Sequence, residues 1–185
     1  LWSGRSDGCV RLWNLRGELL ATLVQFDPEA WLVTTPNGRF AGSADGQSLV
    51  ECQVDNRRYA VGQFFNEYFT PSLLSGLVKG ASVAPARPTA SLGKPPEVTI
   101  VSPIAGKPAA SAVNVTFRVV AQGSGISEPR LFLNGRRISD HSLTSAKAAD
   151  GSLLVQGHLE LAPGLNEIRA TAFNQDASIE ARGDW

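Results

Sequence analysis

The chain has 185 residues, 43% of them hydrophobic and 18% charged, which is an ordinary globular composition with room for one large or two small domains. Its 17 lysine and arginine residues balance 17 aspartate and glutamate residues. This neutrality excludes the electrostatic footprint of a dedicated nucleic-acid or anionic-membrane binder, so we expect protein partners or none.

Membrane and secretion signals are missing from the sequence. No apolar run approaches the roughly 18 residues that span a bilayer, which predicts a soluble chain without a membrane partner. The chain has no methionine and opens on Leu1-Trp2 inside a strand-like stretch, so we interpret it as a piece of a longer polypeptide. Cys9 and Cys52 lack any C-x-x-C spacing, and we expect two free, buried thiols, which favours a reducing, cytoplasmic compartment.

Turn signals divide the first 56 residues into short strands. Asp7-Gly8 separates the two strands of a hairpin, and residues 19–24 form a third strand. The pattern restarts at Trp31, with strands at 31–35 and 39–43. Asp45-Gly46 then predicts a turn into a strand at 48–53. Because Asp45 follows Asp7 by 38 residues, close to the roughly 40 to 45 of a four-stranded propeller blade, we interpret the two stretches as an internal repeat.

Residues 6–14, Ser-Asp-Gly-Cys-Val-Arg-Leu-Trp-Asn, resemble the third-strand signature of a WD-repeat β-propeller. The resemblance implies that Asp7 and Trp13 are structural, with Asp7 hydrogen-bonding inside the blade. Trp31 and Asp45 are the structural residues expected in the second, degenerate copy. The chain would then hold about one and a half blades, 1–56, with the missing blades upstream. A plain antiparallel meander with accidental repeat-like turns is the alternative.

Helices are expected at 57–80, where the strand alternation is lost. Phe64, Phe65, Tyr68 and Phe69 have the spacing that places four aromatics on one helical face. Thr70-Pro71 opens a second short helix, which Gly80 ends. We interpret the aromatic face as core that covers a blade edge or fixes the following domain. Residues 81–96 contain four prolines, which predicts an extended, semi-rigid linker.

Residues 97–185 alternate strand signals with turns, which predicts a small β-sandwich. The expected strands are 97–102, 113–121, 130–134, 136–139, 153–161 and 165–174. The turns at 133–136 and 163–168 resemble those of immunoglobulin-like modules. Because the two-cysteine bridge and buried tryptophan of antibody domains are absent, the resemblance is to the looser bacterial class. His141 and His158 have no partner at ligand spacing, and we expect both at the surface. Asp140, Asp150 and Asp176 are scattered turn residues.

The order of four features is similar to the region between propeller and protease in bacterial caspase-like cysteine peptidases that carry WD repeats. These features are the degenerate blade at 31–43, the aromatic helix at 63–74, the proline-flanked strand at 95–103 and the immunoglobulin-like module. Neither Cys9 nor Cys52 lies in the Q-A-C-x-G setting of such peptidases. The resemblance therefore implies a context and stops short of an activity.

The sequence thus predicts a mainly β chain: partial propeller blades, a short helical pair, then an immunoglobulin-like β-sandwich. We expect a non-catalytic interaction scaffold without metal or cofactor, which positions or regulates a neighbouring effector domain. The first alternative is part of a caspase-like endopeptidase whose catalytic domain lies outside the chain. The second is a cell-surface or carbohydrate-binding sandwich, for which Phe132 and Phe173 are the candidate aromatics, although both are expected in the core.

Overall fold

A computed structural model describes residues 1–4, 6–54, 56–106 and 111–182. The fold is mainly β, with 43% of the described residues in strands and 15% in helices. The chain divides into two units, Leu1–Leu92 and Gly93–Trp185, so the division falls inside the segment expected as a linker. No helix in the described ranges is long and apolar enough to cross a membrane.

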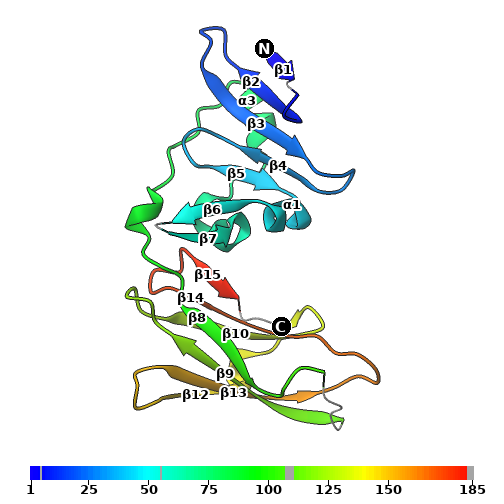
Figure 1. Ribbon diagram of the computed structural model, residues 1–185, viewed down its shortest axis with the longest axis vertical. Helices are drawn as coiled ribbons and strands as arrows, with labels where there is room; N and C mark the ends of the chain where they lie inside the picture. Colours follow the sequence, from blue (N-terminus) through cyan, green and yellow to red (C-terminus); the bar gives the residue numbers. More distant parts are fainter. Residues whose placement is uncertain (5, 55, 107–110, 183–185) are drawn as a thin grey trace. The chain divides into compact units, whose positions relative to one another are not determined.

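The first unit is built on a five-stranded antiparallel sheet whose strands lie side by side in chain order (Figure 1). The strands are β1 (Trp2–Gly4), β2 (Cys9–Trp13), β3 (Leu19–Gln25), β4 (Trp31–Thr34) and β5 (Phe40–Gly42). Tight turns join them, as expected from the Asp-Gly and Asn-Gly signals. Because β4 pairs directly with β3, the expected second blade does not form a separate sheet.

The expected turn at Asp45-Gly46 is wrong, because these residues lie in helix α1 (Ala44–Leu49). The Ser43 side chain caps this helix by accepting a hydrogen bond from Gly46 N, and Asp45 in the first turn favours the positive end of the helix. Asp7, in contrast, lies in the turn between β1 and β2. Asp7 and Asp45 are 38 residues apart in the sequence but lie in two different kinds of structure, a turn and a helix. The expected internal repeat is therefore not present.

The remaining strands and helices of this unit are short. β6 (Glu51–Val54) and β7 (Arg57–Ala60) form a separate two-stranded sheet, so the strand expected at 48–53 is displaced by α1. A 3₁₀ turn, η1 (Val61–Phe64), leads into α2 (Phe65–Tyr68), and α3 (Leu73–Val78) follows. A second 3₁₀ turn, η2 (Thr89–Ser91), lies near the end of the unit.

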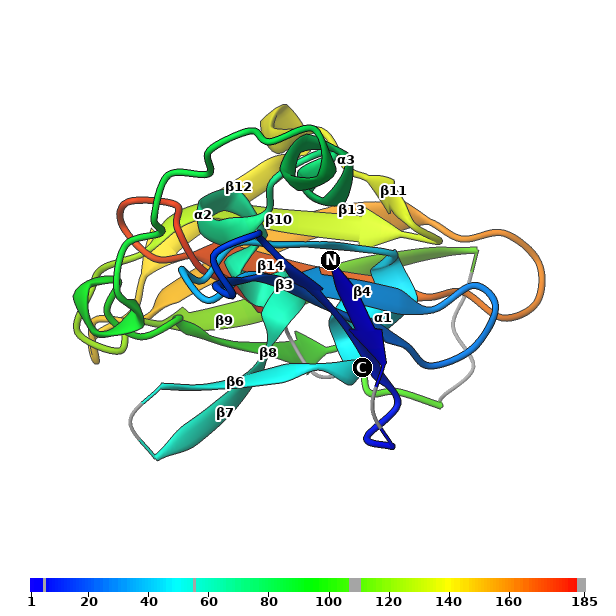
Figure 2. The ribbon, with the colours of Figure 1, turned by 90° about the horizontal axis from the view of Figure 1, so that it is seen from above.

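The core of the first unit forms where α3 packs on the β1–β5 sheet. Figure 2 shows the ribbon of α3 and of these strands from above. Leu73 and Leu77 of α3 contact buried residues of the sheet, among them Leu12 and Val33. Phe69 and Thr70 lie along the outer edge of β5, where Thr70 N donates to Phe40 O at 2.8 Å. The chain after α2 thus covers an edge that would otherwise expose unpaired main-chain groups.

The second unit consists of two four-stranded antiparallel sheets. One has the order β12-β13-β9-β8 and the other β11-β10-β14-β15. The chain alternates between them two strands at a time. Their bounds are β8 (Glu97–Ser102), β9 (Ala112–Val120), β10 (Ser127–Leu133), β11 (Arg136–Arg137), β12 (Leu143–Lys147), β13 (Leu153–Glu160), β14 (Ile168–Phe173) and β15 (Glu180–Arg182), with a 3₁₀ turn η3 (Asp140–Ser142) before β12.

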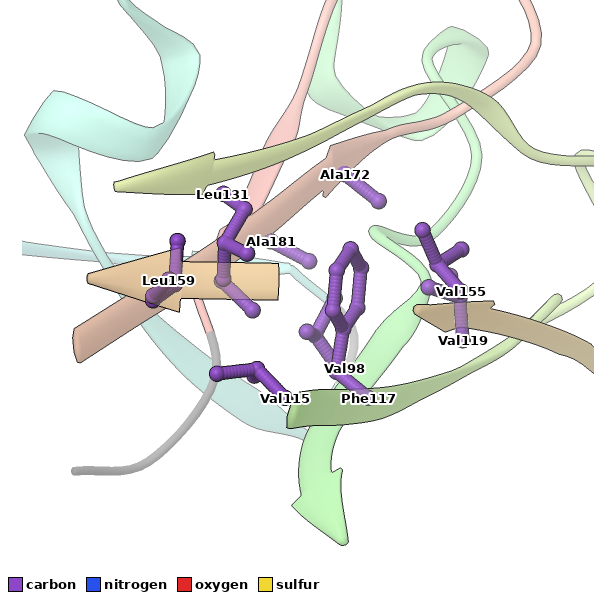
Figure 3. Packing of buried hydrophobic residues seen from close by; sticks show 10 residues of the cluster. Val98, Val115, Phe117, Val119, Leu131, Val155, Leu159, Ala172 and Ala181 are labelled. Atoms are coloured by element: carbon purple, nitrogen blue, oxygen red, sulfur yellow. The ribbon is translucent and has the colours of Figure 1, made fainter. Parts of the chain in front are cut away.

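The two sheets share one core, in which side chains from both point toward one another (Figure 3). Val115, Phe117 and Val119 alternate along β9 with more exposed residues, as the period of a half-buried strand requires. Leu131 of β10 and Ala172 of β14 meet them from the other sheet. Sequence alternation thus located this core, whereas the strands β12 and β15 were not expected.

Candidate functional site

The residues expected to be structural in the first strands make local contacts. Asp7 accepts a hydrogen bond from Cys9 N at 3.0 Å and forms an ion pair with Arg11. Trp13 donates its indole Nε1–H to Ser3 Oγ at 2.8 Å, which ties β2 to β1. Trp31 holds the start of α1, since its N donates to Ser43 Oγ and its O accepts from Ser43 N, both at 3.1 Å.

The aromatic residues Phe64, Phe65, Tyr68 and Phe69 do not share one helical face in the core. They form two stacks instead: Phe64 with Tyr68 at 5.6 Å between ring centroids, and Phe65 with Phe69 at 4.2 Å. Phe64 is fully buried, whereas Phe65 is 45% exposed. The helix α2 is only four residues long, so Phe69 of the second stack lies just beyond its end, where its ring contacts that of Phe40.

A clasp of five side chains joins this region to the segment after α3. We define the clasp as Asn37, Arg39, Glu67, Tyr68 and Arg87, together with the main chain of residues 83–87. Asn37 and Arg39 belong to the tight turn between β4 and β5, while Glu67 and Tyr68 are in α2. Thr35 stabilises the turn, since its Oγ1 accepts from Arg39 N at 3.0 Å.

The turn contributes most of the hydrogen bonds of the clasp. Asn37 Nδ2 donates to Val83 O at 2.9 Å, and Asn37 O accepts from Ala86 N at 3.0 Å. The Arg39 guanidinium donates to three carbonyl oxygens, those of Glu67 at 2.5 Å, Ala84 at 3.2 Å and Pro85 at 3.4 Å. One planar cation thus ties α2 and the 84–85 main chain to a β-turn.

Helix α2 closes the clasp from its own side. Arg87 Nη2 donates to Glu67 Oε2 at 2.6 Å, and the Tyr68 hydroxyl donates to Arg87 O at 2.9 Å. The hydrogen bond from Arg87 lowers the pKa of the Glu67 carboxyl, whereas burial raises the pKa of Tyr68 to about 12. Glu67 is therefore an anion and Tyr68 a neutral donor at neutral pH, which are the states that these bonds need.

The clasp corrects the expectation of a semi-rigid spacer over 81–96. Residues 83–87 have no regular secondary structure, but hydrogen bonds to Asn37, Arg39 and Tyr68 hold them against the first unit. Sequence reasoning found the turn at 36–38 but missed the clasp. Its polar partners are separated by 19 to 46 positions, a distance over which residue spacing gives no signal.

The cysteines and histidines remain separate from one another. Cys9 and Cys52 are free, as expected, but they are only half-buried where full burial was expected. Burial raises the pKa of the Cys52 thiol to about 11, which keeps it in the protonated form that is a poor nucleophile.

Both histidines are exposed. His158 lies on β13 with its Nδ1 2.8 Å from Asn114 Oδ1, and His141 lies in η3. Within the described ranges, no three His, Cys, Asp or Glu side chains are placed to hold a metal ion.

Phe132 and Phe173 each lie beneath an arginine of the second unit. Phe173 is buried, as expected, whereas Phe132 is only half-buried. Arg130 Cζ is 4.5 Å from the Phe173 centroid, and Arg169 Cζ is 4.6 Å from the Phe132 centroid. These are cation–π distances. Guanidinium groups therefore occupy ring faces on which a sugar would stack.

No protein-family model matches the chain, and no curated protein matches it.

Proposed function

We propose that the chain is a non-catalytic interaction scaffold, in which the first unit fixes the start of the connection to a second, immunoglobulin-like binding module. The clasp is the observation that supports this proposal. It holds four carbonyl oxygens and one amide of residues 83–87 with side chains and main chain of the first unit. A connection fixed in this way gives the second module a defined point of attachment, as a positioning element must.

The immunoglobulin-like assignment of the second unit is part of the proposal. Two antiparallel sheets with a common core, visited two strands at a time, are typical of that architecture. The β1–β5 sheet has the consecutive antiparallel order of a propeller blade, although it has five strands where a blade has four. We propose that neighbouring domains of a WD-repeat protein, or separate protein partners, bind to this scaffold.

The proposal is tested by the order of the clasp in the intact chain. NMR relaxation of the ¹⁵N-labelled protein should give the amides of Val83, Ala84, Ala86 and Arg87 order parameters near the rigid-backbone value of about 0.85. Arg39→Ala, which removes three hydrogen bonds, should lower them toward about 0.6 and speed proteolysis of this segment. The control Arg16→Ala, at an exposed turn, should leave both unchanged.

Two outcomes would contradict the proposal. Order parameters below about 0.6 at residues 83–87 of the unmodified chain would remove the fixed start of the connection. Cleavage of arginine- or lysine-ended peptides by the chain, if lost in Cys9→Ala or Cys52→Ala, would show a catalytic thiol and end the non-catalytic assignment.

A further inference from the structure

The strand β12 presents one free edge. In the part of the chain that the structure describes, β12 is the outer strand of its sheet and pairs with β13 alone. Next to it, Ala148 N donates to Ser152 O at 2.8 Å, which makes this a hydrogen-bonded pair. Because hydrogen-bonded and non-hydrogen-bonded pairs alternate in an antiparallel ladder, the even-numbered residues of β12 bond to β13. The main-chain N–H and C=O groups of residues 143, 145 and 147 point outward.

The other sheet edges of this unit are less suited to accept a strand. The pairing of β8 with β9 shifts register between Ile100 and Ser102, and such irregularities blunt an edge. Within the described residues, the strands β11 and β15 are two and three residues long. β12, in contrast, keeps one register with β13 over all five of its residues. Only Lys147, at its end, is charged.

A cavity of about 320 Å³ lies beside the free edge of β12. Two odd-numbered residues of β12, Leu143 and Ser145, face it. Its other lining residues come from both sheets and the loop before β12: Glu128, Pro129, Arg137, Asp140 and Val155. The volume is at the lower end of the roughly 300–1,000 Å³ of small-molecule pockets, so it suits one large side chain better than a cofactor.

The charges around this cavity compensate one another. Arg137 pairs with Asp140 at 2.8 Å, and Glu128 pairs with Arg130. Of the remaining lining residues, Pro129, Leu143 and Val155 are apolar and Ser145 is polar. An incoming charged side chain would find no free counter-charge, whereas an apolar one would bury carbon surface against Pro129, Leu143 and Val155. The cavity therefore favours a leucine or phenylalanine side chain.

We propose that the free edge of β12 and this cavity form a binding site for an extended peptide segment of a protein partner. The segment adds a strand to β12 through the outward main-chain groups and inserts one apolar side chain into the cavity. Opposite residues of an antiparallel pair have their side chains on the same face of the sheet. The side chain of a peptide residue opposite Ser145 would therefore point to the face on which the cavity lies. This inference rests on the proposed scaffold function, since it names how the second unit engages a partner.

The test uses a short host peptide, acetyl-Lys-Thr-Thr-Xaa-Thr-Thr-Lys-amide, with leucine, phenylalanine, aspartate or lysine at Xaa. Each peptide is titrated into the full ¹⁵N-labelled chain, and the amide shifts of residues 143–147 are followed. The leucine and phenylalanine peptides should bind at least about tenfold more tightly than the charged ones, because only an apolar side chain gains from burying carbon surface in the cavity. Equal affinities, or shifts confined to residues outside β12 and the cavity lining, would overturn the proposal.

Main-chain pairing is tested by N-methylation of the leucine peptide. Methylation at Xaa removes the N–H that bonds to Ser145 and should abolish binding, whereas methylation at the next threonine should preserve it. Ser145→Pro removes only an outward N–H of an edge strand, which sheets tolerate, and should also abolish binding. The control Thr144→Ala changes a side chain on the opposite face and should bind as the unmodified chain does.

The remaining outcomes separate this site from the scaffold proposal. Binding that is insensitive to N-methylation overturns the edge site, while rigid residues 83–87 would still support the scaffold. Self-association of the chain through β12 that excludes the peptide would assign the edge to a second copy and also overturn the proposal.

Discussion

Two helical glycines show that the surroundings of a residue decide the effect of an added methyl group. A Cβ on Gly46 would lie 2.1 Å from the main-chain oxygen of Trp31, whereas a Cβ on Gly76 would meet only Ala81 Cβ at 3.6 Å. Glycine in a helix costs about 1 kcal/mol relative to alanine. Propensity alone therefore predicts that both changes to alanine stabilise the unit.

We expect Gly46→Ala to destabilise the first unit and Gly76→Ala to stabilise it by up to about 1 kcal/mol. The first change forces the start of α1 away from β4, because main chain cannot yield as a side chain can. Chemical denaturation of the two variants and the unmodified chain measures both effects. A stabilising Gly46→Ala would show that α1 does not lie against Trp31.

The ion pair of Glu67 with Arg87 should make the first unit depend on pH. Because the hydrogen bond from Arg87 lowers the folded-state pKa of Glu67, the pair stabilises the folded unit above the unfolded value of about 4.3. This stability is lost as the pH falls below about 4.3 through the folded-state pKa.

We expect Glu67→Gln to remove the pH-dependent stability that the ion pair contributes, when the free energy of unfolding is measured from pH 7 down to about 3. Arg87→Ala should remove the same component, which identifies the pair as its source. An unchanged acid dependence in both variants would contradict the ion pair.

At the scale of elements, α3 depends on its two buried leucines. Leu73 is 2% exposed and packs into the core of the first unit, while Val78 at the other end of α3 is 58% exposed. Leu73→Ala should therefore lower the free energy of unfolding by about 2–5 kcal/mol. Val78→Ala, the matched control, should change it by no more than about 0.5 kcal/mol. Similar losses in both variants would place α3 away from the sheet.

The elements found from sequence are those with strong alternation of apolar residues. β9, with Val115, Phe117 and Val119 on one face, was predicted almost to its ends. β12 was not predicted because four of its five residues are exposed, and its sequence therefore shows no alternation of apolar and polar residues. α1 escaped because Asp-Gly is a turn signal; only Ser43 before Asp45 indicated a helix start, and tertiary packing on β4 decided the outcome.

The candidate sites were less accessible to sequence reasoning than the strands. A clasp made of a turn, a helix and an irregular segment depends on contacts between distant positions, such as Asn37 with Val83. The edge site on β12 depends on which strands end a sheet, and no residue type encodes that. The boundary between the two units, after Leu92, lies within the proline-containing segment at 81–96.

At the scale of the whole molecule, the two units should unfold as separate cores. The core clusters around Val33 and around Phe117 share no residue. Phe117→Ala, at a fully buried position, should lower the stability of the second unit by about 3–5 kcal/mol. Hydrogen exchange measured along the chain should accelerate in residues 97–106 and 111–182 and remain unchanged in β1–β5. Equal acceleration in both units would show a single cooperative core.

The clasp also bears on how the connection can vary among related chains. Residues 83–87 are held at several points by hydrogen bonds, so an insertion there would have to break contacts with the β4–β5 turn or α2. The chain is held again from Leu92, which is 3% exposed, and at Lys94, whose O accepts from Ser124 Oγ at 2.8 Å. Natural length variation in the connection should therefore be concentrated at the mostly exposed residues 88–91, and a protein engineer who wishes to lengthen the tether should add residues there.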